Sequence, residues 1–117
     1  MSDCVDKCLI ITDVDLPVVA SVFALVNHSG ELVVEYRLED DDEPRLNFTK
    51  RATVDRDDTL TMARRLHISV EELPARLNEE CGSASDGTPS EGEYIFGEAL
   101  NYIIEAGVQY RLKESNL

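Results

Sequence analysis

Apolar and polar residues alternate in the first half of the chain with the two-residue period of half-buried strands. Residues 18–26 are nearly all apolar, and residues 31–39 alternate between an apolar row and a mostly polar row. A Gly-containing turn at residues 27–30 joins these two runs into a predicted hairpin. A third alternating run follows at residues 46–52, after an acidic turn that ends at Pro44. The pattern predicts an antiparallel meander with one core face and one largely wet face.

The spacing of apolar residues changes to the period of a helix after Val54. It predicts three helices, at about 57–67, 70–81 and 91–106. Gly107 supplies the stop of the third helix. Pro74 lies beyond the first turn of the second helix, so we expect it to kink this helix or to move its start. Each helix is also preceded by a polar residue suited to cap it, with an acid three residues later: Asp55 and Asp58, Ser69 and Glu72, and Ser90 and Glu93.

Three further segments complete the predicted fold. Residues 9–11 form a short apolar run that suits either a buried strand or one face of a helix. Residues 82–92 are rich in Gly and Ser and predict a mobile surface loop. Residues 108–113 alternate again and predict a final strand at an edge of the meander. We therefore expect a single α+β domain over residues 1–117, an antiparallel β-meander of three to four strands with three helices packed mainly on one face.

The charge of the chain is strongly negative and unevenly placed. There are 24 Asp and Glu residues against 11 Lys and Arg residues, which gives a net charge of −13. Residues 44–78 hold most of the cations and are net positive, whereas both flanks are net negative. A negative chain repels nucleic acid and anionic membrane surfaces and favours basic partners. The candidate partner-binding residues are cations of the positive middle, which we interpret as an internal or subunit counter-charge: Lys50, Arg51, Arg56, Arg64 and Arg65.

Residues 62–73 resemble a helix-turn-helix unit, because Ala63, a turn near His67 and Leu73 have the spacing with which two short helices cross closely. The resemblance implies a nucleic-acid-binding regulator, which is our first alternative function. His67 stands where the motif usually has glycine, and Pro74 lies within the would-be recognition helix. That helix is also rich in glutamate, which DNA phosphates repel. We therefore expect nucleic acid not to be the main partner.

Cysteine and histidine residues suggest a second alternative, a metal-dependent or thiol enzyme. Cys4, Cys8, Cys81, His28 and His67 supply enough ligands for zinc, but their spacing matches no zinc motif. Cys81 with His67 is the helical candidate for a nucleophile and its base. We expect His67 instead to cap a helix or to lie in a partly exposed turn. The sequence therefore predicts no catalytic residue, no metal site and no cofactor.

The remaining features favour a binding protein of the cytoplasm. An odd cysteine count is typical of a reducing compartment, and the N-terminus lacks the basic and apolar regions of a secretory signal. The longest apolar stretch, residues 16–26, is about half as long as a membrane-spanning helix. We expect a non-enzymatic binding or regulatory protein that uses an acidic surface to engage a basic protein partner. Val33 is apolar within a polar row, and residues 18–26 have a second apolar face, so we also expect self-association as a homodimer.

Overall fold

The computed structural model describes residues 5–11, 18–40, 47–81 and 89–116 of the 117-residue chain. The predicted acidic turn before Pro44, Cys4 and the first part of the predicted mobile loop, residues 82–88, lie outside these described residues. The strands are β1 (Val5–Ile11), β2 (Val18–Val26), β3 (Leu32–Asp40), β4 (Phe48–Val54) and β5 (Arg111–Asn116). The helices are α1 (Arg56–Leu66), the short 3-10 helix η2 (Val70–Glu72), α2 (Leu73–Cys81) and α3 (Pro89–Glu105).

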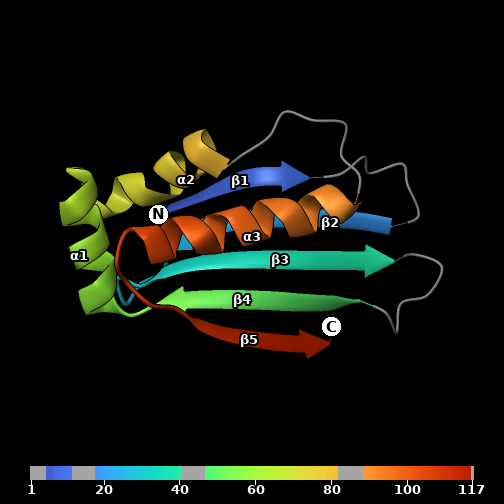
Figure 1. Cartoon of the computed structure of the whole chain (residues 1–117). Helices are drawn as coiled ribbons and strands as arrows, with labels where there is room; N and C mark the ends of the chain where they lie inside the picture. The colour runs from blue at the N-terminus through green and yellow to red at the C-terminus, as the bar shows by residue number, and fades with distance from the viewer. Residues whose placement is uncertain (1–4, 12–17, 41–46, 82–88, 117) are drawn as a thin grey trace.

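The described strands form one antiparallel sheet in the order β1-β2-β3-β4-β5 (Figure 1). The predicted hairpin is β2 with β3, where Val22 lies opposite Tyr36 and Ala24 opposite Val34. The α+β class is confirmed, and the meander has five strands where the pattern predicts three to four. The additional strand is the N-terminal one, because residues 5–11 pair with β2 instead of forming a helix. The C-terminal run joins β4 at the edge, as predicted.

One face of the sheet packs against the helices and forms the core. In Figure 1, α3 crosses the sheet, packing on β2 and β3, while α2 packs on β1 and β2 and α1 lies at one end. The Tyr36 and Phe96 rings meet between β3 and α3, with their centroids 5.9 Å apart. Full burial of one large apolar side chain stabilises the fold by about 1.5–3 kcal/mol. The largest fully buried apolar side chains include Leu32, Met62, Leu73, Leu77 and Ile103.

The other face of the sheet carries the alternate side chains of the same strands. No described helix packs on it, so we call it the helix-free face. Val33 belongs to this face, and yet only 5% of it is exposed in the single chain. The burial of Val33 therefore needs no second subunit, and the homodimer stays a prediction.

The connection between α1 and α2 explains how the chain accommodates Pro74. His67 is the C-cap of α1 in the left-handed conformation, with φ of 60°, and its N–H bonds to carbonyls of the last turn of α1. The predicted capping role of His67 is thus confirmed. The 3-10 helix η2 follows, and α2 begins only at Leu73. Pro74 consequently lies in the first turn of α2, where its missing N–H has no carbonyl to bond. Of the two predicted outcomes, the later helix start is the one observed.

The predicted N-caps are only partly right. Asp55 and Ser69 do occupy the N-cap positions of α1 and η2, but neither side chain makes a capping hydrogen bond. The prediction that Ser90 caps the last helix is wrong, because α3 already begins at Pro89 and Ser90 lies inside it. Proline has the φ angle of a helix and loses no hydrogen bond in the first turn, so it is a favourable start. Residues 89–92 are therefore helix and not part of the predicted loop.

A buried threonine fixes α1 to the sheet. The Thr59 hydroxyl donates to the Val54 carbonyl at 3.0 Å and accepts a hydrogen bond from the Leu32 N–H at 3.0 Å. Thr59 is completely buried, so these bonds satisfy backbone groups that water does not reach. They join the start of β3 and the end of β4 to the first turns of α1.

Candidate functional site

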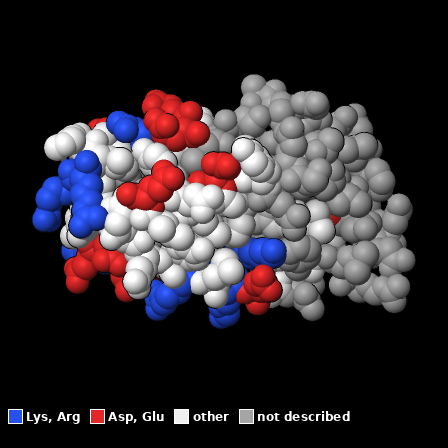
Figure 2. All heavy atoms as spheres, viewed as in Figure 1, with Lys and Arg blue, Asp and Glu red and all other residues white. Residues whose placement is uncertain are grey.

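The five cations predicted to bind a partner lie on separate parts of the molecule. Lys50 and Arg51 are consecutive on β4, so their side chains project from opposite faces of the sheet. Arg56, Arg64 and Arg65 belong to α1, where Figure 2 shows a group of Lys and Arg side chains at the end of the molecule. The structure therefore does not bring the five residues onto one surface.

The two cations of β4 lie beside acids of the same chain. Lys50 Nζ is 3.9 Å from Glu114 Oε1 of β5. Arg51 Nη2 is 3.0 Å from Glu35 Oε1 of β3 and donates a hydrogen bond to it. Partly exposed pairs of this kind contribute about 0–1 kcal/mol each. Both cations thus act as counter-charges within the chain.

The arginines of α1 contribute in a different way. Arg65 Nη1 donates a hydrogen bond of 2.7 Å to the Ala106 carbonyl, just after the C-terminal end of α3. Gly107 follows with φ of 82°, and a Cβ atom at this position would overlap the Arg65 guanidinium. A cation is favourable at a helix C-terminus, where carbonyl groups lack partners. Arg65 therefore links α1 to the end of α3, whereas Arg56 and Arg64 are exposed.

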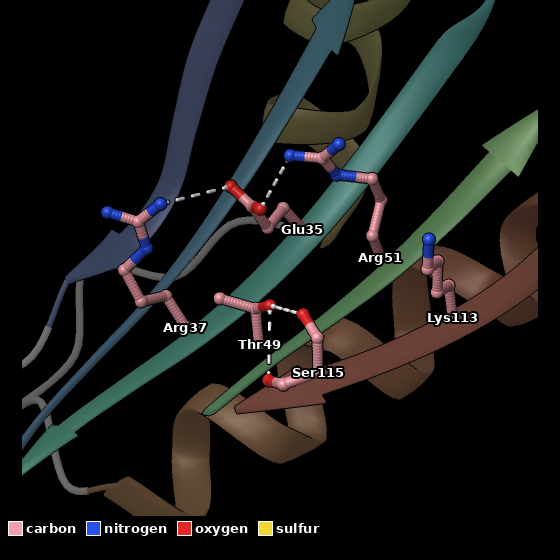
Figure 3. A pocket seen from close by; sticks show the side chains of 6 residues that line it. All are labelled: Glu35, Arg37, Thr49, Arg51, Lys113 and Ser115. Atoms are coloured by element: carbon pink, nitrogen blue, oxygen red, sulfur yellow. Dashed lines mark hydrogen bonds and ion pairs between the residues drawn. The ribbon is translucent and has the colours of Figure 1, made fainter. Parts of the chain in front are cut away.

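A hollow of about 240 Å³ lies on the helix-free face, over β3, β4 and β5. We call it the sheet-face hollow, and Figure 3 shows its side chains standing on the three strands with helices behind the sheet. It is smaller than the roughly 300–1,000 Å³ of drug-sized ligand pockets, so it suits a small group. Its lining residues are Glu35, Arg37, Thr49, Arg51, Lys113 and Ser115.

Glu35 is the single acid among the described residues that line the sheet-face hollow, and two guanidinium groups flank it (Figure 3). One carboxylate oxygen lies 3.0 Å from Arg51 Nη2 and the other lies 3.9 Å from Arg37 Nη2. Only 13% of the Glu35 side chain is exposed. The carboxylate therefore holds two cations in place while leaving the cluster net positive.

Two cations of the sheet-face hollow are cross-strand neighbours. Arg51 of β4 and Lys113 of β5 are directly opposite in the sheet register, so they share one face. Like charges directly opposite on neighbouring strands destabilise the pair. Among the described residues, no carboxylate lies within ion-pair distance of Lys113. The hollow thus combines three cations with one acid inside a strongly acidic protein.

Two hydroxyl groups lie beside these cations. Thr49 Oγ1 and Ser115 Oγ are 3.0 Å apart, joined by a hydrogen bond in which either can donate (Figure 3). Thr49 is buried, whereas Ser115 is exposed. The pair gives the sheet-face hollow neutral hydrogen-bonding groups as well as cationic ones.

A second hollow, of about 260 Å³, lies on the helical side of the molecule between α2 and α3. We call it the acidic hollow, and Figure 2 shows acidic side chains gathered over these two helices. Neither Lys nor Arg is among the described residues that line it. Its lining residues are Glu80, Glu98, Asn101, Tyr102 and Glu105.

Exposed aromatic and aliphatic side chains accompany the acids on α3. Tyr94 is 65% exposed and Ile104 is 54% exposed. Glu98 accepts a hydrogen bond from the Tyr94 hydroxyl, and this bond together with the charge of Glu98 raises the pKa of Tyr94 above its ordinary value. The helix therefore offers acidic and apolar contacts side by side.

The segment that resembles a helix-turn-helix unit does not present a free recognition helix. Leu73, Pro74 and Leu77 are buried where α2 packs against the sheet. The exposed side of α2 carries Glu79 and Glu80. Its outward surface is therefore acidic, which is unfavourable for contact with phosphates.

The residues proposed for metal or thiol chemistry come from four different parts of the fold. Cys8 lies in β1, Cys81 ends α2, His28 lies in the turn before β3 and His67 caps α1. Within the described ranges, no group of three or more His, Cys, Asp or Glu residues is arranged to hold a metal ion. The structure thus provides no evidence that these residues form a shared metal or catalytic site.

Known proteins provide no guide to this chain. Comparisons with protein-family models, with curated protein sequences and with solved structures find no match. None of the helices in the described part of the chain is long and apolar enough to cross a membrane. Any functional proposal therefore rests on the two hollows.

Sequence reasoning found only one residue of the sheet-face hollow, Arg51. The polar rows of β3 and β4 are visible as alternation, and they do contain Glu35, Arg37 and Thr49. The other wall of the hollow, however, comes from β5, where the cross-strand neighbour of Arg51 is Lys113, 62 residues further along the chain. No pattern of neighbouring residues in the sequence predicts that Lys113 lies opposite Arg51.

Proposed function

We propose that this protein is a small, non-enzymatic binding protein of the cytoplasm that recognises a basic segment of a protein partner through its acidic helical face. The observation that carries the proposal is the acidic hollow between α2 and α3, where Glu80, Glu98 and Glu105 line one depression without a Lys or Arg among them. Three carboxylates with no neutralising side chain favour a cationic group from outside.

The exposed apolar side chains of α3 support protein recognition over the capture of a small cation. Interfaces are enriched in aromatic anchors within a polar surround, and Tyr94 and Ile104 supply such contacts on the same helix as the acids. A lysine-rich or arginine-rich segment with an apolar residue matches both features. The net charge of −13 also attracts such a segment at long range and raises its association rate.

The two other functions considered from the sequence gain no specific support from the geometry. A nucleic-acid regulator needs a cationic helix, and α2 presents Glu79 and Glu80. A metal enzyme needs a cluster of ligands, and no group of three or more His, Cys, Asp or Glu among the described residues is arranged to hold a metal ion. Self-association of the chain stays a prediction, which light scattering tests.

Removing two of the carboxylates should weaken binding of a basic peptide. We expect the double substitution Glu98→Gln and Glu105→Gln to reduce affinity for a fluorescent lysine-rich peptide about tenfold, since each exposed ion pair contributes up to about 1 kcal/mol. Fluorescence anisotropy at low and at high salt measures this, and binding should also weaken as salt screens the charges.

The matched control is the double substitution Glu71→Gln and Glu72→Gln. Both residues are exposed in η2 and outside the acidic hollow, and the change in net charge is the same. This variant should keep nearly all of the affinity. Equal losses in the two variants, or equally tight binding of an acidic peptide, would contradict the proposed function.

A further inference from the structure

The sheet-face hollow contains an arrangement that a stable sheet does not need. Arg51 and Lys113 are cross-strand neighbours of like charge, which by itself destabilises the pairing of β4 and β5. Departures from locally favourable choices of this kind concentrate at functional sites, where a ligand supplies the missing interaction. An anion between the two cations converts their repulsion into two attractions.

The net charge of the sheet-face hollow indicates the charge of the anion that it would bind. The described residues that line the hollow are three cations, one carboxylate and two neutral residues, an excess of two positive charges, with Glu39 outside the hollow but 3.9 Å from Arg37. Phosphate groups carry about −1.5 to −2 at neutral pH, which matches this excess, whereas one carboxylate carries half as much. We propose that the sheet-face hollow binds a phosphate dianion, either inorganic phosphate or the phosphoryl group of a small molecule.

Hydrogen-bond donors around the hollow fit the several oxygens of a phosphate. Arg51 and Lys113 supply charged donors, and the hydroxyls of Thr49 and Ser115 supply neutral ones from the same two strands. Arg37 Nε is buried and has no hydrogen-bond partner among the described residues. A buried donor without an acceptor is uncommon. The N–H of Arg37 Nε is therefore available to an acceptor atom of a ligand.

A single phosphate fits the molecule better than a nucleic acid does. A polymer would have to lie along the protein surface, and the net charge of −13 repels its further phosphates. The hollow itself measures about 240 Å³, which holds one small group. This site is on the opposite face from the acidic hollow, so it is independent of the proposed function.

Nuclear magnetic resonance titration of the full-length ¹⁵N-labelled protein tests the site. Sodium phosphate is added at constant ionic strength, with sodium chloride as the reference, and phosphoserine and acetate are added in parallel. We expect saturable shifts of the β4 and β5 amides with phosphate or phosphoserine and none with acetate. The stronger of the two phosphates identifies the free ion or an ester as the ligand. No saturation with either, or equal saturation with acetate, overturns the proposal.

The substitution Lys113→Gln should weaken phosphate binding about tenfold, because it removes a charge-assisted contact. Lys50→Gln is its matched control. This substitution also removes one positive charge, but Lys50 projects from the face of the sheet opposite to Lys113. Ser115→Ala, which changes no charge, should also weaken binding if the hydroxyl contacts the ligand. The proposal fails if Lys113→Gln and Lys50→Gln have equal effects, or if Lys113→Gln and Ser115→Ala both bind as the unaltered protein does.

Discussion

Replacing Leu77 with alanine is expected to lower the free energy of unfolding by about 2–5 kcal/mol. Leu77 is completely buried on α2 and belongs to the same apolar cluster as Leu73 and Ile103. Alanine is at least as favourable as leucine in a helix, so the loss arises from packing and not from helix propensity. A domain of ordinary stability has only about 5–15 kcal/mol in total, so the substitution removes a large part of it. Urea denaturation followed by circular dichroism measures the change.

The comparison variant is Leu60→Ala on α1. Leu60 is 42% exposed, so truncating it removes far less buried surface, and we expect a loss below about 1 kcal/mol. If Leu60→Ala and Leu77→Ala cost the same, then α2 does not pack on the sheet as described. Because α2 forms one wall of the acidic hollow, Leu77→Ala should also weaken binding of the lysine-rich peptide as the fold loosens.

The substitution Glu35→Gln is expected to act in opposite directions on stability and on anion binding. It removes the charge that holds Arg51 at 3.0 Å and Arg37 at 3.9 Å, and leaves three cations close together. We expect a loss of about 1 kcal/mol in the free energy of unfolding, less than for a fully buried pair because both guanidiniums are partly exposed. Phosphate affinity should rise several-fold, since the hollow gains a further positive charge.

Glu39→Gln provides the control for this prediction. Glu39 also lies near Arg37, at 3.9 Å, but its side chain is half exposed and it does not line the sheet-face hollow. Stability should change by less than about 0.5 kcal/mol and phosphate affinity should stay the same. A loss of phosphate affinity in Glu35→Gln would show that Glu35 orders the cations for the ligand instead of competing with it.

The local features of the fold were predictable because they depend on residues close in sequence. The alternation in β3, next to the apolar run of β2 and a turn ending at Gly30, specifies the hairpin, since a shift of β3 by one residue would turn its apolar side chains to the wet face. Capping by His67 and the stop at Gly107 are local as well. The start of α2 was ambiguous because proline is tolerated in a first turn and disruptive further along.

The candidate sites were less predictable because they depend on contacts between distant segments. The positive middle of the sequence does not indicate whether its cations share one surface. In the fold, Lys50 and Arg51 project from opposite faces of β4, and the other three arginines lie on α1. The spacing of Glu98 and Glu105 places both on one side of a helix, which the sequence alone indicates. That Glu80 of α2 joins them follows only from how the two helices pack.

Mapping the site of a bound lysine-rich peptide tests the proposed function most directly. In ¹⁵N-labelled protein, titration with the peptide should shift the amide signals of Glu80, Glu98, Asn101 and Glu105 in a saturable way, because these residues line the acidic hollow. The signals of β4 and β5 should stay in place. Saturable shifts confined to the helix-free face, or no saturable shift at all, would contradict recognition of a basic partner by α2 and α3.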